Sequence, residues 1–538
     1  ARSDVKYVSL DREVKQLGHL SLSTGADAAR ALGGASGYDG TGVGIAVLDS
    51  GVYAQHRNFA DKTGVQRNIL GVDFTGEGRT DDIYGHGSHV ASVAAGGDAV
   101  AGGAYRGVAL NAKVINLRVL NSEGKGTVST LLAAIDWVKT NRAAHNIRVV
   151  NMSLGTAAVD SYRDDPLCLA VRGLVDAGVV VIAAAGNQGK RTGALGLEEK
   201  VYGLIHAPGN DPSVITVGAS NTFGTDARMD DAVASYSSRG PTRSGWTDTL
   251  GVRHYDNLIK PDLVAPGNRI IEAQSPANLL VTQNPTLDAN VAGPATREQM
   301  YMSGSSMAAP AVAGAAALVL QANPSLTPNL VKAILMYTAQ PLAGFNNFEQ
   351  GAGQLNVEGA VRLARLIRTD LSSATPVGSP LLVAAAPAPQ TTIAGHTFYW
   401  SQGVIMDHTF ATGANLITKY QAVYGLGVLL ADGTVETNGV LMSDGVLMSD
   451  GVLMSDHILT SAGITISEGL IYLGTGVLLA DGVLLADGVL LADGVLLADG
   501  LLLADGVLSS NVIAHAARAM IEGDPGPSMR VVVDRATK

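Results

Sequence analysis

Three polar residues, each within its own short motif, have the types and the order of a nucleophilic triad. Asp49 begins Asp-Ser-Gly, His86 begins His-Gly-Ser-His-Val-Ala, and Ser306 lies in Gly-Ser-Ser-Met-Ala-Ala-Pro. A serine hydroxyl is a weak nucleophile at neutral pH, so it needs a neighbouring imidazole to take its proton and a carboxylate to orient that imidazole. The three residues would therefore support acyl transfer if the fold brings them together.

The segments around these residues predict an α/β fold that places them at one edge of a sheet. Residues 43–48 form a continuous apolar run, which is typical of a parallel strand buried on both faces. Asp49 follows that strand at its carboxyl end, where open α/β sheets hold their ligands. Residues 87–95 and 307–320 are rich in small side chains and predict two helices, which begin beside the histidine and the serine.

Roughly residues 20–370 resemble the subtilisin-like serine peptidases of the S8 family. The resemblance rests on several motifs in family order, which include Ser-Leu-Gly, Ala-Ala-Gly-Asn and Lys-Pro-Asp-Leu-Val-Ala-Pro-Gly as well as the three above. The order Asp, His, Ser is the known order of the subtilisin triad. The resemblance implies a parallel sheet covered by helices and the hydrolysis of peptide bonds. Asp49 would orient His86, His86 would be the general base and Ser306 the nucleophile.

The resemblance also assigns donors for the oxyanion that forms during acyl transfer. Residues 179–185 indicate a second buried strand, and Asn187, shortly after it, matches the side-chain oxyanion donor of the family. The backbone N–H of Ser306 would be the second donor, at the amino end of a helix. Ser305 stands where the family usually has threonine, which is a conservative change.

Two segments match the family pattern for holding the substrate. Peptide substrates pair through their backbone with exposed extended segments, and glycines there would let a substrate approach closely. Each segment follows a predicted strand. The predicted substrate-binding residues are Gly124, Lys125, Gly126, Ser153, Leu154 and Gly155. The expected partner is therefore a polypeptide substrate.

Taken one at a time, these motifs have simpler interpretations. An isolated Asp-Ser-Gly is usually a turn, His-Gly-x-His could be a metal site or a helix start, and Gly-Ser-Ser-Met-Ala could serve helix packing. Their joint occurrence in family order favours the peptidase interpretation. Ser50, Ser88, Ser303 and His89 are then structural neighbours of the triad.

The chain extends on both sides of the predicted peptidase domain, residues 20–370. With 538 residues it is longer than one core usually spans. Residues 1–19 resemble the end of the family's propeptide, and an ordinary N-terminal strand is the alternative. Residues 371–426 predict a linker or an extended strap, rich in Pro, Ala and Ser, followed by a mixed segment of no assigned function. Residues 512–538 form a C-terminal tail.

Composition limits the compartments and partners. Cys168 is the only cysteine, so an intrachain disulfide is impossible, and we expect a core residue there. Asp and Gly interrupt the apolar runs of the C-terminal half, so none reaches the ~20 residues of a membrane helix. The chain has neither a basic patch nor an aromatic platform for nucleic acid. It does not begin with methionine, so we expect that an upstream part has been removed, and no long apolar N-terminal segment remains as a signal peptide.

Residues 427–511 repeat every six residues. Gly-Val-Leu-Leu-Ala-Asp and Gly-Val-Leu-Met-Ser-Asp recur, and this segment holds eleven of the 48 acidic residues and none of the 37 Lys and Arg residues. Because six is a multiple of two and not of 3.6, the pattern predicts strands with Asp-Gly turns between them. We therefore expect residues 427–511 to form an all-β repeat domain. A β-solenoid with coils stacked about 4.8 Å apart is favoured, and a β-meander is the alternative.

The repeat also leads us to expect self-association. Each hexad carries three large aliphatic residues, and strand alternation points at least one of them away from the others. An exposed apolar stripe usually marks an interface. The aspartates would accept backbone N–H bonds in the turns, and the alternative is that rows of them bind Ca²⁺. The chemistry requires no cofactor, although the family often binds structural calcium.

Together these observations predict an exported serine endopeptidase, extracellular or at the cell surface, whose repeat domain serves assembly or anchoring. The alternative is a structural filament or surface-layer subunit in which the peptidase fold only matures the protein. The complete set of catalytic motifs favours the enzyme.

Overall fold

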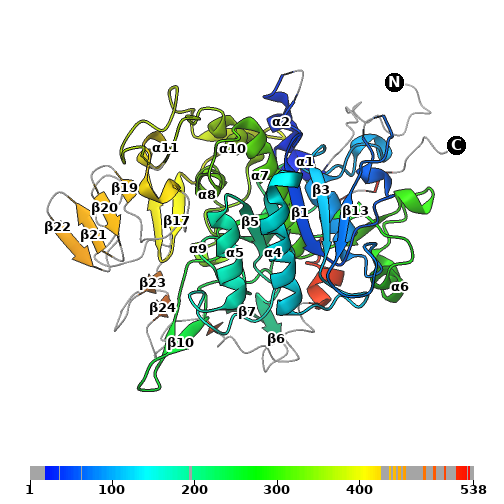
Figure 1. The fold of residues 1–538 in the computed structure, drawn as a ribbon, viewed down its shortest axis with the longest axis horizontal. Helices are drawn as coiled ribbons and strands as arrows, with labels where there is room; N and C mark the ends of the chain where they lie inside the picture. The colour runs from blue at the N-terminus through cyan, green and yellow to red at the C-terminus, as the bar shows by residue number, and fades with distance from the viewer. Residues whose placement is uncertain are drawn as a thin grey trace, which may run out of the picture.

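The computed structural model describes residues 19–34, 37–61, 63–192, 197–372, 374–425, 517–529 and 531–532, and the backbone of seven short strands between residues 435 and 503 (Figure 1). The described chain begins at α1 (His19–Ser23). The prediction of a propeptide remnant or N-terminal strand for residues 1–19 therefore lies almost entirely outside the described residues.

A central sheet of parallel strands organises the molecule (Figure 1). The strands follow the order β12-β8-β5-β4-β1-β3-β2, all neighbours are parallel, and β9 joins β8 in an antiparallel pair. The bounds are β1 (Gly44–Asp49), β2 (Leu70–Asp73), β3 (Lys113–Arg118), β4 (Ile147–Met152), β5 (Val180–Ala184), β8 (Ile215–Asn221), β9 (Ala232–Val233) and β12 (Leu263–Pro266). The predicted parallel sheet is confirmed.

Helices cover both faces of this sheet (Figure 1). α4 (Val128–His145) and α5 (Pro166–Asp176) pack on one face, and α3 (His86–Ala95) and α7 (Ser305–Ala322) pack on the other. Side chains of β1 alternate between the two resulting cores, as strand geometry requires. Both faces are thereby buried, which explains the unbroken apolar run of this strand.

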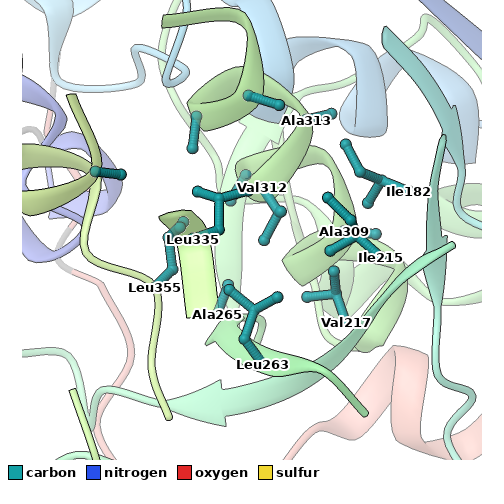
Figure 2. Close-up of a cluster of buried hydrophobic side chains, with 14 of the residues drawn as sticks. Ile182, Ile215, Val217, Leu263, Ala265, Ala309, Val312, Ala313, Leu335 and Leu355 are labelled. Carbon is teal, nitrogen blue, oxygen red and sulfur yellow. The ribbon is translucent and has the colours of Figure 1, made fainter. Parts of the chain in front are cut away.

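The helix α7 fills the centre of one core. Its Ala309, Val312 and Ala313 side chains lie among residues of the central strands (Figure 2). A Cβ added to Gly314 of this helix would lie 2.6 Å from the Cβ of Val108, so the missing side chain allows close approach. Among the described residues, α7 is the one helix long and apolar enough to cross a membrane, but 83% of it is buried inside the protein. It is therefore a core helix here.

The remaining described elements are shorter. The other helices are α2 (Ala26–Ala31), α6 (Leu279–Gln283), α8 (Pro328–Tyr337), α9 (Asn347–Gln350), α10 (Val357–Ala364) and α11 (Asn415–Thr418). Antiparallel pairs join β6 (Lys190–Thr192) to β7 (Glu198–Tyr202), β10 (Gly245–Thr247) to β11 (Arg253–Tyr255), and β13 (Ile270–Ala273) to β14 (Gln299–Met302). Cys168 is buried in α5, as expected, and burial raises the pKa of its thiol.

The chain beyond residue 370 packs against the same core. Leu381 is buried, and its backbone bonds to Arg368 and Thr418, so this stretch is a strap rather than a free linker. Two hairpins follow, β15 (Gln390–Ile393) with β16 (His396–Tyr399) and β17 (Gly403–Met406) with β18 (Thr409–Thr412). Phe398 and Trp400 join the core cluster that contains α7.

The described strands of the repeat pair in two ways. β19 (Val435–Thr437), β20 (Val440–Ser443), β21 (Val446–Ser449) and β22 (Val452–Ser455) form an antiparallel sheet in chain order. β23 (Val477–Leu479) and β24 (Val489–Leu491) are parallel, and β25 (Leu502–Leu503) runs parallel to β7. Neighbouring antiparallel strands are what a meander requires, whereas a solenoid requires parallel ones. The choice between them, and the domain as a whole, stays a prediction because most of its residues lie outside the described ones.

Candidate active site

Asp49 and His86 are in direct contact at the carboxyl edge of the sheet. Asp49 is the last residue of β1, and His86 is the first residue of α3. The Oδ1 atom of Asp49 lies 2.7 Å from Nδ1 of His86 and accepts a second hydrogen bond of 2.8 Å from the Ser50 backbone N–H. A carboxylate only accepts, so Nδ1 carries a proton and Nε2 is available to accept another. The exposed fractions of the two residues are 0% and 5%.

A second buried carboxylate, Asp82, ties the start of α3 to the end of β1. Its Oδ1 accepts from the Gly85 N–H (2.7 Å) and the Ser50 hydroxyl (2.8 Å), and its Oδ2 accepts from the Ser88 N–H (2.7 Å). The Ser50 hydroxyl in turn accepts from the Gly87 N–H at 2.9 Å. We did not predict Asp82 as a site residue. An Asp shortly before a helix start is a familiar cap, and that signal could have identified it.

The electrostatics of this pair favour a basic imidazole. Burial of His86 opposes its charged form, but the attraction of Asp49, their hydrogen bond and the charge of Asp82 outweigh burial, so the pKa of His86 is raised above its ordinary value of 6.5. Burial also raises the pKa of Asp82, although its hydrogen bonds act in the opposite direction. His86 is therefore suited to take up a proton from a neighbouring hydroxyl.

Ser306 lies in the first turn of α7 and is paired with Ser153. The Ser306 hydroxyl donates to the Ser153 carbonyl oxygen (3.1 Å), and the Ser153 hydroxyl donates to the Ser306 carbonyl oxygen (2.7 Å). Within the described chain, no hydrogen bond joins the Ser306 hydroxyl to His86, although α7 packs against α3. In this structure the hydroxyl is therefore engaged by the Ser153 carbonyl oxygen and not by an imidazole. Catalytic hydrogen bonds are often incomplete without substrate.

Asn187 is held beside the turn that leads to Ser306. Its Oδ1 accepts from the Ser305 backbone N–H at 2.8 Å and lies 3.0 Å from the Ser305 hydroxyl. Because Oδ1 is engaged in this way, Nδ2 is the end of the amide that can donate to an oxyanion. A Cβ on Gly304, whose φ is +150°, would lie 2.9 Å from that Nδ2, which explains the glycine. Ser305 also bonds to Gly186.

The two predicted substrate segments differ in how the fold uses them. Ser153 and Leu154 follow β4, and Ser153 is bonded to Ser306 as described. A Cβ on Gly155 would lie 2.9 Å from the Ala207 carbonyl oxygen, so this glycine is required by packing within the chain. Its role toward substrate stays a prediction.

The segment with Gly124, Lys125 and Gly126 is an exposed turn after β3. Gly124 has a φ of +75°, and a Cβ there would collide with the Tyr84 ring. The Lys125 side chain is exposed and pairs with Glu123 at 2.8 Å. These glycines are also explained by the turn itself, and substrate binding here stays a prediction.

His206 occupies a position near the site that we did not predict. Side chains added to Gly155 or Gly186 would touch its ring, so the imidazole lies between the segments that carry Ser153 and Asn187. Its Nε2 is buried without a hydrogen-bond partner, and burial lowers the pKa of the ring to about 4. The neutral ring thus presents an unpaired polar atom beside the candidate site.

A metal site would need several donor side chains gathered at one place. Within the part of the chain that the structure describes, no three His, Cys, Asp or Glu side chains come together to hold an ion. Structural calcium therefore stays a prediction.

Known proteins resemble this chain over the region that contains the candidate site. The sequence model of the subtilase family, peptidase S8, matches residues 40–354. Serine protease AprX of Bacillus subtilis (strain 168) is 35% identical over 370 residues, covering 67% of this chain and 75% of AprX. The extracellular serine proteinase of Thermus sp. (strain Rt41A) is 32% identical over 344 residues, covering 63% and 66%. A cold adapted subtilisin-like serine proteinase of known crystal structure is 29% identical, with a TM-score of 0.41 and coverage of 59% and 90%. Because the family match spans more than half of the chain, this protein belongs to the subtilase family and is a subtilisin-like serine endopeptidase.

Proposed function

We propose that Ser306 is the nucleophile of the peptidase reaction, His86 its base, Asp49 the orienting carboxylate and Asn187 an oxyanion donor. The contact of 2.7 Å between Asp49 Oδ1 and His86 Nδ1 carries the proposal. It supplies a base of fixed orientation at the edge of the sheet where α7 begins. The bonds from Ser305 to Asn187 support the assignment of the donor.

The reaction follows from these assignments. The Ser306 Oγ attacks the carbonyl carbon of the scissile peptide bond while its proton moves to Nε2 of His86. The Asn187 Nδ2 and the Ser306 backbone N–H donate to the resulting oxyanion. The C–N bond then breaks as His86 returns the proton to the leaving amine, which leaves an acyl ester on Ser306. Water, deprotonated by His86, hydrolyses that ester and regenerates the hydroxyl.

A serine-directed phosphonofluoridate tests the nucleophile. We expect the wild-type protein to be labelled at Ser306 and to lose peptidase activity in proportion to labelling. The Ser306→Ala variant should be folded, unlabelled and inactive. As a matched control, Ser372→Ala removes an exposed serine hydroxyl and should be labelled like the wild type. Label on another residue of Ser306→Ala, with activity retained, would rule out this assignment.

The substrate is a polypeptide held along its backbone, with Gly124, Lys125 and Gly126 on one side and Ser153, Leu154 and Gly155 on the other. Peptide substrates N-methylated at single backbone positions test this geometry. Methylation of amides that pair with the enzyme should raise KM, whereas methylation beyond the bound stretch should not. Equal KM values for the whole series would contradict strand pairing.

The enzyme acts outside the cell or at its surface. One relative is named an extracellular serine proteinase, and that name supports export of this chain. Expression of the full gene in its native host, followed by assay of medium, surface and cell fractions, tests the location. Activity confined to the interior of the cell would contradict it.

The repeat, residues 427–511, assembles or anchors the enzyme. The support is the surplus of large aliphatic residues in every hexad. Sizing and electron microscopy of the purified protein should show assemblies, and a monomer at high concentration would exclude them. If assemblies form and the phosphonofluoridate does not label them, the protein is instead a filament or surface-layer subunit matured by its own peptidase. Thermal stability unchanged by a chelator would exclude structural calcium.

A further inference from the structure

The described residues 517–529 and 531–532 lie against the peptidase domain, although they are far beyond the part matched by the family. We call them the C-terminal strap. They begin with a helical turn at 517–522, drawn in red (Figure 1), and Gly523 continues this turn with a backbone bond to Ala519. Ala519, Asp524 and Met529 are buried, so the strap is packed rather than merely adjacent.

The strap contacts the turn from which Ser306 emerges. The Ser303 backbone N–H donates to the Met520 carbonyl oxygen at 3.0 Å. The Ser303 hydroxyl accepts from the Arg269 N–H at 2.9 Å. A Cβ on Gly523 would overlap the Ser303 hydroxyl. The strap therefore lies directly on a residue three positions before the proposed nucleophile.

A buried carboxylate fastens the strap beside this contact. Asp524 Oδ2 accepts from the Ser235 backbone N–H at 2.7 Å, and Oδ1 accepts from the Ser235 hydroxyl. The Asp524 N–H donates to Asn268 Oδ1 at 2.7 Å. Asn268 follows Gly267, whose carbonyl oxygen accepts from the Gly304 N–H at 2.8 Å. Asp524 is thus also connected to the turn through Asn268 and the neighbouring Gly267, which bonds Gly304.

The far end of the strap is held independently. Met529 packs in a small core with Tyr105 and Ile271. The Tyr105 hydroxyl donates to the Val532 carbonyl oxygen (2.9 Å) and accepts from the Val532 N–H (2.7 Å). Burial raises the pKa of Tyr105 to about 12, so this hydroxyl remains a donor at ordinary pH.

We infer that the C-terminal strap is a positioning element for the nucleophile: it holds the turn of residues 303–306 in the orientation from which the Ser306 hydroxyl reacts. The inference rests on the proposed role of Ser306. Without the strap, the Ser303 N–H loses its partner and the outer side of the turn loses its packing. Displacement of a reacting group by about 1 Å can cost about 10²-fold in rate.

Two glycines of the strap offer a matched test. Gly523 and Gly526 both have positive φ, of +63° and +143°, so alanine strains the backbone at either position. A Cβ at Gly523 would strike the Ser303 hydroxyl, whereas at Gly526 it would meet only the Phe223 ring, at an ordinary 3.5 Å. Backbone strain alone should therefore penalise Gly526→Ala at least as much as Gly523→Ala, because a φ of +143° lies outside the left-handed helical region, and only the substitution at Gly523 also strikes the turn.

We expect Gly523→Ala to lower kcat and the rate constant of phosphonofluoridate labelling by about 10²-fold, with KM at its wild-type value. Gly526→Ala should keep wild-type rates. Equal rates in both variants, or equal losses that follow the folded fraction by circular dichroism, would overturn the inference.

A second pair of variants covers the case in which Gly523→Ala does not fold. Asp524→Ala removes both bonds to Ser235 and should lower the labelling rate, whereas Asp524→Asn keeps one acceptor and should restore part of it. Identical labelling rates in this pair would also overturn the inference. The two failures can be distinguished. If Ser306 is not the nucleophile, the wild-type protein is not labelled there. If only the role of the strap is wrong, the wild type is labelled at Ser306 and the strap variants are labelled at the same rate.

Discussion

The two halves of the candidate site are held in different ways. The side-chain hydrogen bonds that orient Asp49 and His86 come from residues 49–88, and most of them come from the α3 start and the turn before it. The backbone carbonyl oxygen of Asp49 also accepts from the N–H groups of Val119 and Leu120, which follow β3. The turn that carries Ser306 is held by segments from distant parts of the chain. Its partners are Ser153, Asn187, Gly267 and Met520. The orientation of the proposed base therefore depends mainly on a local side-chain network, whereas the orientation of the proposed nucleophile depends on the assembly of the whole domain.

Asp49→Asn disrupts the half of the site that is held locally, Asp49 with His86, which we call the local half. It has the largest expected effect. The amide leaves the ring in place but favours the wrong tautomer of His86, so kcat should fall by about 10⁴-fold with little change in KM. Steady-state kinetics with a peptide substrate measure this. Asp248→Asn is a matched control, since Asp248 also bonds a histidine, His254, at 3.0 Å but away from the site. Full activity in Asp49→Asn would contradict the assigned pair.

Asn187→Ala disrupts the other half of the site, the turn of Ser306 with its partners from distant parts of the chain, which we call the distant half. It has the second largest expected effect. It removes the proposed oxyanion donor and the acceptor of the Ser305 N–H, so kcat should fall by about 10²–10³-fold while KM stays close to wild type. Asn290→Ala, at an exposed asparagine, serves as the control. An increase in KM with unchanged kcat would instead assign Asn187 to ground-state binding.

The pH dependence of kcat/KM reports on the local half alone, through the pKa of His86. A base must be neutral, so kcat/KM should rise with pH through the pKa of His86, above 6.5. The same raised pKa stabilises the fold fully below 6.5, and this contribution is lost as pH rises through the folded-state pKa. Asp82→Asn removes one charge that raises this pKa, so the acid limb should move to lower pH. An unmoved limb would mean that Asp82 carries no charge there.

His206→Ala has the smallest expected effect and probes the distant half. Removal of the ring opens space between the segments of Gly155 and Gly186. Selectivity between peptides with small and bulky residues at the cleaved bond should therefore change, while labelling by a small phosphonofluoridate stays the same. Kinetics on paired peptides measure the change. An equal loss on every substrate would indicate a structural role.

Much of the local half could be predicted from the sequence. The apolar run 43–48 placed Asp49 at a strand end, and β1 ends there. The small-residue segment 87–95 forms α3, which begins one residue earlier than expected, at His86. The helix α7 begins at Ser305, two residues before the expected start at residue 307. These elements are short-range, so periodicity and burial pattern identify them.

The contacts made at long range could not be predicted in this way. His206 stands in no motif that marks it, and its position beside Gly155 and Gly186 is set by packing between segments distant in the chain. The sequence left open whether the stretch after residue 370 was a linker or a strap, and the backbone bonds of Leu381 decided the question. The sequence of the C-terminal tail, residues 512–538, contains no motif that predicts its contact with Ser303.

The sequence by itself indicated the reaction class, through motifs that resemble those of the subtilisin-like peptidases. It also predicted the strand and the helices that carry Asp49, His86 and Ser306, because burial periodicity is written along the chain. Only the tertiary structure decided that the Ser306 hydroxyl pairs with Ser153 and that the C-terminal strap rests on Ser303. Such bonds join residues far apart in the chain. They form only when the whole core is packed, and no local pattern encodes them.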